Sequence, residues 1–303
     1  MGATGADILD LSGRSVMITV MAPAKINLTL EVLAKRTDGF HEIRSVIQTI
    51  GLCDRLSFQD GETFECKSGS PGWLAEKSLI PEATRLLRET TGCYRGAVIT
   101  VEKCIPLVGG LGGDSSDAAA TLRGLNQFWE LALPQNKLLE LARQLGSDVA
   151  FFLDGGTALV EGRGELVIPL PPLPRTWVVL VIPTIPQLPE KTKQLYESLK
   201  PSHYTDGQIT RRMVAKLREG GELAMSLLFN AFENVTFTHF PKLNVYRERM
   251  IRAGAPHIHQ AGSGPILFTL FKDRTQAEEL SRHLKEQKIK SYLAETIPSN
   301  KNS

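Results

Sequence analysis

Residues 106–116 read PLVGGLGGDSS and stand between a strand-like segment and a helix-like one. The glycines allow positive φ and let backbone N–H groups approach an anion closely. A helix that starts at Ser115 or Ser116 adds unpaired N–H groups and the positive end of its dipole. The two hydroxyls can donate to phosphate oxygens or ligate a magnesium ion. We therefore predict a polyphosphate site whose members are Pro106, Leu107, Val108, Gly109, Gly110, Leu111, Gly112, Gly113, Asp114, Ser115 and Ser116.

Other interpretations of this loop can be weighed against that one. A flexible turn capped by Ser115 or Ser116 would explain an isolated glycine-rich run, because glycine motifs often match by chance. The strand–loop–helix context and four glycines within five residues favour the phosphate site instead. The Walker pattern fails because no lysine follows the loop. The dinucleotide pattern G-x-G-x-x-G fails because Ser115 occupies its third glycine position, and no well-placed acid follows about twenty residues later.

The segments around the loop mix strand and helix patterns irregularly. This mixture, without a βαβ rhythm, favours an α+β fold. A helix is predicted from near Ser116, because apolar residues recur at helical spacing up to Trp129. Elsewhere the expected strands are 42–50, 54–59, 97–103, 177–183 and 265–271, with a turn at 51–54. The expected helices are 79–91, 135–145, 191–199, 208–219, 222–234 and 275–287.

The proline-rich run PLPPLPRT, residues 169–176, is the best candidate for a domain boundary. A chain of 303 residues is long enough for two medium domains that each bury a core. We expect a flexible tail at 1–16, an N-terminal domain at 17–170, a C-terminal domain at 171–295 and a C-terminal tail at 296–303.

Charge and composition exclude several classes of protein. Lys and Arg number 35 against 33 Asp and Glu, and a nucleic-acid partner would need clustered positive charge. No apolar run reaches the roughly 18 residues of a membrane helix, and no stretch resembles a signal peptide. The four cysteines lack zinc-ligand spacing and are expected to be reduced thiols. We expect a cytoplasmic monomer or weak homodimer with no nucleic-acid or membrane partner.

The N-terminal segment AKINLTLEV, residues 24–32, alternates apolar and polar side chains. A period of two predicts a strand. Lys25 and Asn27 therefore share one face and point away from the core.

The loop resembles the signature of the superfamily that joins galactokinase, homoserine kinase, mevalonate kinase and phosphomevalonate kinase. Residues 22–58, APAKINLTLEVLAKRTDGFHEIRSVIQTIGLCDRLSF, are similar to the narrower family of 4-diphosphocytidyl-2-C-methyl-D-erythritol kinases. Runs at 145–165, 228–235 and 261–271 fit the same family, so the resemblance covers about residues 17–290. It implies a two-domain α+β fold, with an N-terminal ribosomal-protein-S5-like domain and a C-terminal ferredoxin-like α/β-plait domain.

The resemblance also implies a reaction. ATP would phosphorylate the 2-hydroxyl of 4-diphosphocytidyl-2-C-methyl-D-erythritol in the non-mevalonate pathway to isopentenyl diphosphate. The catalytic pair falls on Lys25 and Asp148. Asp148 would accept the hydroxyl proton, while Lys25 would hold Asp148 ionised and stabilise charge on the transferred group. Magnesium would neutralise the triphosphate, although no dedicated metal site of carboxylates is visible.

By the same resemblance, the cytidine end of the acceptor falls on Asn27, Phe40 and His41, since a ring can stack on a base. A Phe-His pair that packs locally in a hairpin is the plain alternative. Asn230 and Glu233 are expected to be structural. Further substrate-side positions are Thr192, which aligns loosely, and the turn Gly262, Ser263 and Gly264.

Four positions depart from the family pattern. Asp114 replaces a glycine beside the triphosphate, and it either faces the phosphates or caps a helix. Ala261 lacks the usual hydroxyl, Pro265 lacks a backbone donor, and Ser78 replaces an asparagine on the adenine side. Two rivals stay open: a kinase of the same superfamily with another acceptor, and a nucleotide-binding protein that has lost catalysis. The run KRTDGFHE, residues 35–42, speaks against the first, and Lys25 with Asp148 speaks against the second.

Overall fold

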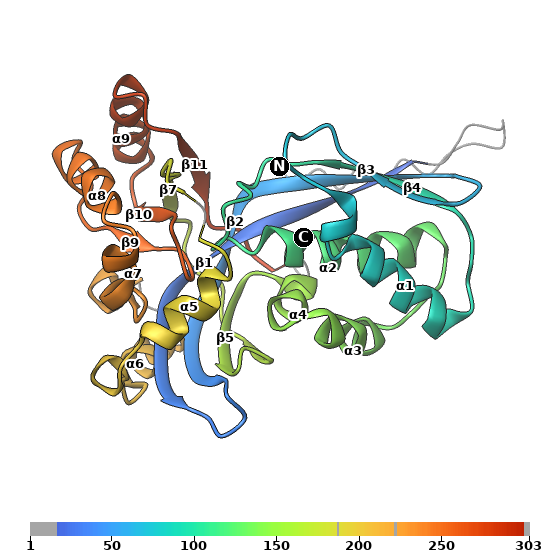
Figure 1. Ribbon diagram of the computed structural model, residues 1–303, viewed down its shortest axis with the longest axis horizontal. Helices are drawn as coiled ribbons and strands as arrows, with labels where there is room; N and C mark the ends of the chain where they lie inside the picture. Colours follow the sequence, from blue (N-terminus) through green and yellow to red (C-terminus); the bar gives the residue numbers. More distant parts are fainter. Residues whose placement is uncertain (1–16, 187, 221–222, 300–303) are drawn as a thin grey trace.

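The computed structural model describes residues 17–186, 188–220 and 223–299, and it arranges them around two sheets (Figure 1). In the seven-stranded sheet, β3, β4, β2, β1 and β8 are neighbours in that order, and β5 and β6 continue from β2. The four-stranded sheet has the order β11-β7-β10-β9. The α+β fold expected from the sequence is confirmed. The first sheet contains β1 Ile18–Lys35, β2 His41–Gln59, β3 Phe64–Lys67, β4 Ala97–Glu102, β5 Thr157–Gly162, β6 Leu166–Pro169 and β8 Phe229–Asn230. The second contains β7 Trp177–Val181, β9 His259–Gln260, β10 Leu267–Phe271 and β11 Ser291–Glu295.

Strands β1 and β2 form one long antiparallel hairpin through the larger sheet. The turn predicted at 51–54 is wrong, because β2 runs on through these residues. Pro23 pairs with Cys53 and the next residue, Ala24, pairs with Ile50, so two residues of β2 have no partner there. This is a β-bulge, which bends a strand without ending it. A glycine followed three residues later by an aspartate looks the same in sequence for a bulge and for a turn.

Four helices cover one face of the larger sheet: α1 Ile80–Thr91, α2 Gly113–Phe128, α3 Gln135–Leu145 and α4 Ser147–Asp154 (Figure 1). Helix α2 lies against β1 and β2 and is flanked by α1 and α4. Its close approach depends on small residues, since a Cβ at Gly124 would lie 2.3 Å from the Phe58 ring. The core under α2 is therefore set by side-chain size as well as by hydrophobicity.

The remaining helices belong to the C-terminal half: α5 Lys191–Ser198, α6 Gln208–Arg218, α7 Glu233–His239, α8 Leu243–Arg252 and α9 Arg274–Glu286. Helix α9 packs on β7, β10 and β11, and α8 contacts α9. Asp273 caps α9 by accepting a hydrogen bond from the Gln276 N–H at 2.9 Å. Short 3-10 turns stand at Ala75–Lys77, Pro201–His203 and Met225–Leu227.

The helix predicted over 222–234 is wrong for the described residues 223–234. They form the turn at Met225–Leu227, then β8, and α7 begins only at Glu233. β8 is parallel to β1, with Leu30 opposite Asn230. Apolar residues at 228, 231 and 232 mimic a helical face, but they are buried through contacts with distant strands.

The sequence predicts a tail at each end of the chain, and the structure describes only part of the C-terminal one. The tail predicted at 1–16 lies outside the described residues. Residues 296–299 do not behave as a tail, because they return to the larger sheet. The Ile297 N–H donates to the Thr49 carbonyl at 3.1 Å, and Ser299 bridges to Gly155.

The proline-rich run 169–176 connects β6 of the larger sheet to β7 of the smaller one. Among the described residues, no helix combines the length and apolar character needed to span a bilayer.

Candidate active site

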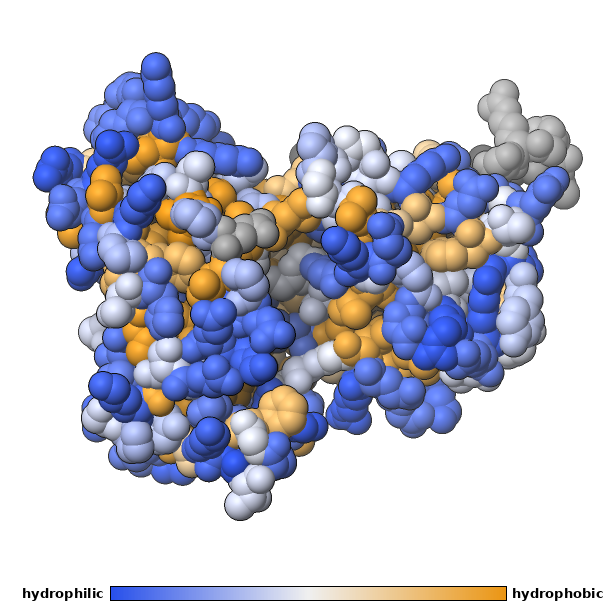
Figure 2. Space-filling view, viewed as in Figure 1, coloured by the Kyte–Doolittle hydropathy of each residue, from blue (hydrophilic) through white to orange (hydrophobic). Residues whose placement is uncertain are grey.

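A cleft of about 1430 Å³ is lined by residues of both halves of the chain. The space-filling view is indented between the part that carries α1–α4 and the part that carries the smaller sheet (Figure 2). The cleft wall includes these residues singled out from the sequence: Lys25, Asn27, Phe40, His41, Pro106, Leu107, Gly109, Gly110, Gly112, Gly113, Asp114, Ser115, Asp148, Thr192, Gly262 and Ser263.

Four further predicted residues do not line this cleft. Leu111 is fully buried and Ser116 is 1% exposed, so their side chains face the core. The Ser116 hydroxyl has no hydrogen-bond partner among the described residues. Val108 lines a smaller neighbouring cavity of about 220 Å³, and Gly264 lies behind Gly262 and Ser263.

The glycine loop connects β4 to α2 in the strand–loop–helix context that the sequence predicts. Gly109, Gly110 and Gly112 have φ of 83°, 97° and 72°. There is also no room for a side chain at Gly112, because a Cβ there would lie 2.8 Å from the Phe152 ring. Helix α2 begins at Gly113, slightly earlier than predicted, so Asp114 and both serines belong to its first turn. The backbone N–H groups of Gly113, Asp114 and Ser115 are therefore the free donors of a helix N-terminus, whereas the Ser116 N–H donates to the Gly112 carbonyl at 2.9 Å.

Lys25 and Asp148 meet beside this loop. The Lys25 backbone N–H donates to the Leu111 carbonyl at 2.9 Å, which fastens the loop to β1. The Lys25 Nζ lies 3.8 Å from the Asp148 Oδ2, and the side chains are 8% and 41% exposed. The lysine is thus held inside the wall, while the carboxylate at the start of α4 faces the open cleft.

Asn27 lies on the same face of β1 as Lys25, as the alternation predicts, but this face is not solvated. The Lys25 Nζ donates to the Asn27 Oδ1 at 2.9 Å, and the Asn27 Nδ2 donates to the Ser45 Oγ at 2.9 Å. This chain fixes which way the amide points and holds the ammonium next to the cleft.

Phe40 and His41 lie at the tip of the β1–β2 hairpin. The Arg163 guanidinium stands 4.6 Å from the Phe40 ring centre, and the Phe40 side chain is 54% exposed. His41 stacks on Tyr196 with ring centres 4.8 Å apart. Burial, and secondarily the charge of Lys35, lowers the pKa of His41. A neutral imidazole has one donor and one acceptor nitrogen, the combination needed at the edge of a base.

Tyr196 is a cleft residue that the sequence analysis missed. It follows Thr192 by four residues on α5, so the two side chains share one face of that helix. That spacing was the available signal. Thr192 itself contacts the second turn, with its Oγ1 2.9 Å from the Ser263 Oγ.

The turn at 261–264 packs directly on the glycine loop. A Cβ at Gly110 would lie 2.5 Å from the Ala261 carbonyl oxygen, so the two backbones touch. The Asn230 amide donates to the Gln260 and Gly262 carbonyls at 2.9 and 2.8 Å, which agrees with the structural role expected for it. Ala261 is fully buried, so its side chain points into the core and not into the cleft.

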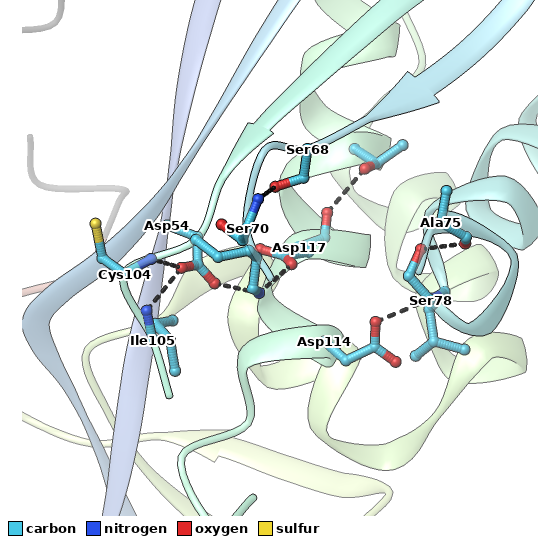
Figure 3. Close-up of polar contacts among 12 residues, drawn as sticks. Asp54, Ser68, Ser70, Ala75, Ser78, Cys104, Ile105, Asp114 and Asp117 are labelled. Atoms are coloured by element: carbon cyan, nitrogen blue, oxygen red, sulfur yellow. Dashed lines mark hydrogen bonds and ion pairs between the residues drawn. The ribbon is translucent and has the colours of Figure 1, made fainter. Parts of the chain in front are cut away.

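Asp114 turns away from the loop toward the start of α1 (Figure 3). Its Oδ1 accepts a hydrogen bond from the Leu79 N–H at 3.0 Å. Burial raises the pKa of Asp114, although the bond from Leu79 and the charge of Lys103 oppose that rise. The sequence left two alternatives for Asp114, facing the phosphates or capping a helix. In the structure, its carboxylate accepts from Leu79, the N-cap residue of α1.

A buried ionic cluster holds both ends of the glycine loop, and the sequence analysis missed it (Figure 3). The Lys103 Nζ donates to the Asp54 Oδ2 at 2.5 Å and to the Asp117 Oδ2 at 2.6 Å. The Asp54 Oδ1 accepts from the N–H groups of Cys104 and Ile105. Both carboxylates are fully buried, and burial raises the pKa of Asp117 to about 7. These contacts hold residues 103–105, before the loop, at a fixed position relative to Asp117, after the loop.

Comparison with known proteins agrees with this geometry. Residues 78–156 match the model of the GHMP kinases N terminal domain, and residues 213–290 match that of the GHMP kinases C terminal. The 4-diphosphocytidyl-2-C-methyl-D-erythritol kinase of Dehalococcoides mccartyi is 48% identical over 281 residues, which is 93% of this chain and 99% of that protein.

Solved structures give the same result. A crystal structure of a 4-(cytidine 5'-diphospho)-2C-methyl-D-erythritol kinase superposes with a TM-score of 0.79 at 30% identity, covering 92% of this chain and 99% of that one. The homoserine kinase of Cytophaga hutchinsonii superposes with a TM-score of 0.72 at 19% identity, covering 97% and 98%, which shows the shared fold alone.

Proposed function

The chain belongs to the 4-diphosphocytidyl-2-C-methyl-D-erythritol kinases within the GHMP kinase family, and on this premise we propose how its residues carry out the reaction. The enzyme transfers the γ-phosphoryl group of ATP to the 2-hydroxyl of 4-diphosphocytidyl-2-C-methyl-D-erythritol. The products are the 2-phosphate and ADP, in the non-mevalonate pathway to isoprenoid precursors. The observation that carries the proposal is that Lys25, Asp148 and the glycine loop meet in one cleft.

Phosphoryl transfer asks the protein mainly to position two substrates and to stabilise charge. Asp148 is the one of the pair that is open to the cleft, so it orients the acceptor hydroxyl and takes its proton. Lys25 has its ammonium within reach of Asp148 and of the loop, and it stabilises negative charge on the phosphoryl group in flight. Asn27 holds the Lys25 ammonium in that place through its Oδ1.

The phosphates of ATP lie on the glycine loop. The N–H groups of Gly113, Asp114 and Ser115 start α2 and point to an anion at the helix N-terminus. The Ser115 hydroxyl lines the cleft, whereas that of Ser116 is buried, so Ser115 is the serine that contacts phosphate.

Magnesium is proposed to enter with ATP. The described residues contain no group of three or more His, Cys, Asp or Glu that could hold a metal ion, so the phosphates would supply most ligands. The Ser115 hydroxyl is an oxygen donor of the kind that Mg²⁺ accepts and would complete the set. When bound, the ion neutralises charge on the β- and γ-phosphates.

The acceptor's cytidine end is placed at the hairpin tip. Phe40 offers an exposed ring, and the neutral His41 offers a donor and an acceptor on a ring already stacked on Tyr196. Thr192 and Ser263 are hydrogen-bonded to each other, and both line the cleft. We place them on the side of the bound acceptor opposite the hairpin tip.

The direct test of this function compares acceptors in a coupled assay of ADP release. We expect turnover with 4-diphosphocytidyl-2-C-methyl-D-erythritol and at most background with homoserine or mevalonate. Equal turnover with one of those acceptors would assign the chain another reaction, and no turnover with any acceptor would favour a nucleotide-binding protein without catalysis.

Two further properties are part of the proposal. A cytoplasmic location follows from the sequence argument on reduced cysteines, and all four cysteines are free thiols. We also propose a monomer or weak homodimer without a membrane partner, and the balance of 35 basic against 33 acidic residues argues against a nucleic-acid partner.

A further inference from the structure

Lys191 is a half-buried cation that the mechanism above does not use. It is the first residue of α5, and its Nζ donates to the Gly264 carbonyl. No carboxylate of the described residues forms an ion pair with it, in contrast to Lys193 two residues later, which pairs with Glu190. Withdrawing an ammonium from solvent without a counter-ion costs free energy, and proteins ordinarily pair such a group or use it.

The position of this ammonium relates it to the phosphate loop. A Cβ at Gly109 would lie 3.3 Å from the Lys191 Nζ. The ammonium can therefore lie this close to the loop backbone because residue 109 has no side chain. Gly109, Gly110, Thr192 and Ser263 line both the main cleft and the smaller cavity that Lys191 borders. Lys191 itself lines the smaller cavity only, and its ammonium lies between Gly109 of the glycine loop and the Gly264 carbonyl.

The charges around it favour an anion. Burial, and then the positive charge of Lys25, lowers the pKa of Lys191 to about 8. Two lysines that repel each other thus face the same loop, and Asp148 is the one carboxylate within ion-pair distance of Lys25 among the described residues. Asp114, the acid of the glycine loop, accepts from the Leu79 N–H, and Glu190, the neighbour of Lys191 in sequence, pairs with Lys193. A phosphate group between Lys25 and Lys191 would relieve this excess of positive charge.

We propose that Lys191 is a phosphate-binding residue, which donates to a phosphate group held between the glycine loop and the turn at 262–264. This inference rests on the proposed function, because it requires a substrate phosphate in the cleft. On binding, one N–H of the ammonium exchanges the Gly264 carbonyl for a phosphate oxygen, or serves both, since an ammonium has three donors. The phosphate is either part of the ATP triphosphate or the diphosphate of the acceptor.

The test measures binding to Lys191→Met by calorimetry, with adenylyl imidodiphosphate and CDP as separate probes. Methionine keeps the length of the stem and removes the charge. Loss of a charge-assisted hydrogen bond is worth roughly 10- to 100-fold in affinity for the probe whose phosphate contacts Lys191. Loss with adenylyl imidodiphosphate assigns the triphosphate, and loss with CDP assigns the acceptor's diphosphate. Unchanged affinity for both probes overturns the proposal.

Two variants separate binding from structure. Lys216→Met removes an exposed lysine from α6 and should bind both probes as the wild type does. Lys191→Arg restores the charge and should recover part of the lost affinity. If Lys191 only fastens α5 to Gly264, Lys191→Met will lower the melting temperature of the free protein without weakening either probe, and the proposal fails.

The outcome for Lys191 can be told apart from that for the proposed function. Binding of the probes does not require turnover. Wild-type protein that binds both probes but phosphorylates no acceptor contradicts the proposed function, while the Lys191 comparison still stands. Wild-type protein that turns over normally, with Lys191→Met equal to it in binding, contradicts this inference alone.

Discussion

At the scale of single residues, two acidic side chains near the cleft have different roles: one faces the substrates, and the other stabilises the protein. Asp148 is open to the cleft, whereas Asp114, only one residue from the phosphate-contacting Ser115, is turned to the Leu79 N–H. The sequence left the direction of Asp114 open, because the direction of a side chain in the first turn of α2 depends on where α1 begins. The same holds for Lys191, whose importance appears only when Gly109 is seen beside it.

Asp114→Gly tests this assignment. We expect the KM for ATP to stay within about twofold of wild type, because the carboxylate does not face the phosphates. The free energy of unfolding should fall by about 1 kcal/mol, since the Leu79 N–H loses its acceptor. Asp114→Asn keeps an acceptor oxygen and should keep the stability. A severalfold lower KM for ATP in both variants would mean that the carboxylate faces the triphosphate after all.

The lowered pKa of Lys191, about 8, predicts a pH dependence of nucleotide binding. Between pH 8 and 10.5, the ordinary pKa of a lysine, the unfolded chain holds this proton and the folded chain releases it, so the folding stability contributed by this group rises with pH. Binding has the opposite sign, because the phosphate needs the charged ammonium. Affinity for the probe whose phosphate contacts Lys191, whether adenylyl imidodiphosphate or CDP, should fall as the pH rises from 8 to 9.5.

The control for this pH dependence is Lys191→Met, in which Lys25 is unchanged. Its affinity should be lower than that of wild type at pH 7.5 and should change less between pH 8 and 9.5. Identical pH profiles for the two proteins would show that Lys191 does not set the dependence.

At the scale of elements, the glycine loop is positioned by what stands before and after it. The Asp54–Lys103–Asp117 cluster joins the bulged strand β2, the end of β4 and the second turn of α2. Next to it on the same two strands, Arg55 and Glu102 form an exposed ion pair. Adjacent pairs thus differ mainly in burial, which decides how much an ion pair contributes.

This difference gives a matched pair of variants. Asp54→Ala should lower the free energy of unfolding by about 3–5 kcal/mol, because it leaves the N–H groups of Cys104 and Ile105 without an acceptor and Lys103 with Asp117 as its one remaining partner in the cluster. Glu102→Ala, at the exposed pair, should cost about 0–1 kcal/mol. Denaturant unfolding measures both. Equal losses in the two variants would show that the cluster does not hold the loop.

The elements also show which parts of the fold a sequence can predict. Helices with a clear apolar stripe, such as α3, α6 and α9, lie where the periodicity places them. The β2 bulge and the region of β8 do not, because long-range pairing with β1 decides both. The Lys25–Asn27 face followed from alternation, but its burial did not, since the layer that covers it comes from α4 and the glycine loop.

At the scale of the whole molecule, the two sheets meet where the glycine loop touches the turn at 261–264. We propose the domain boundary within 169–176, at the connection from β6 to β7. The described C-terminal residues then cross back to β2, so the two halves are joined at both ends of the second one. Chemistry at this junction draws Lys25 and Asp148 from one half and Thr192 and Ser263 from the other.

The measurement that tests the central claim most directly is turnover by Asp148→Asn beside its binding of both substrates. Asparagine keeps the size of the side chain and cannot take the proton of the acceptor hydroxyl. We predict that kcat falls about 10²- to 10⁴-fold, while the affinities for adenylyl imidodiphosphate and for the acceptor stay within a few-fold of wild type. A variant that turns over at nearly the wild-type rate would contradict the account, because the proton would then leave by a route that does not involve Asp148.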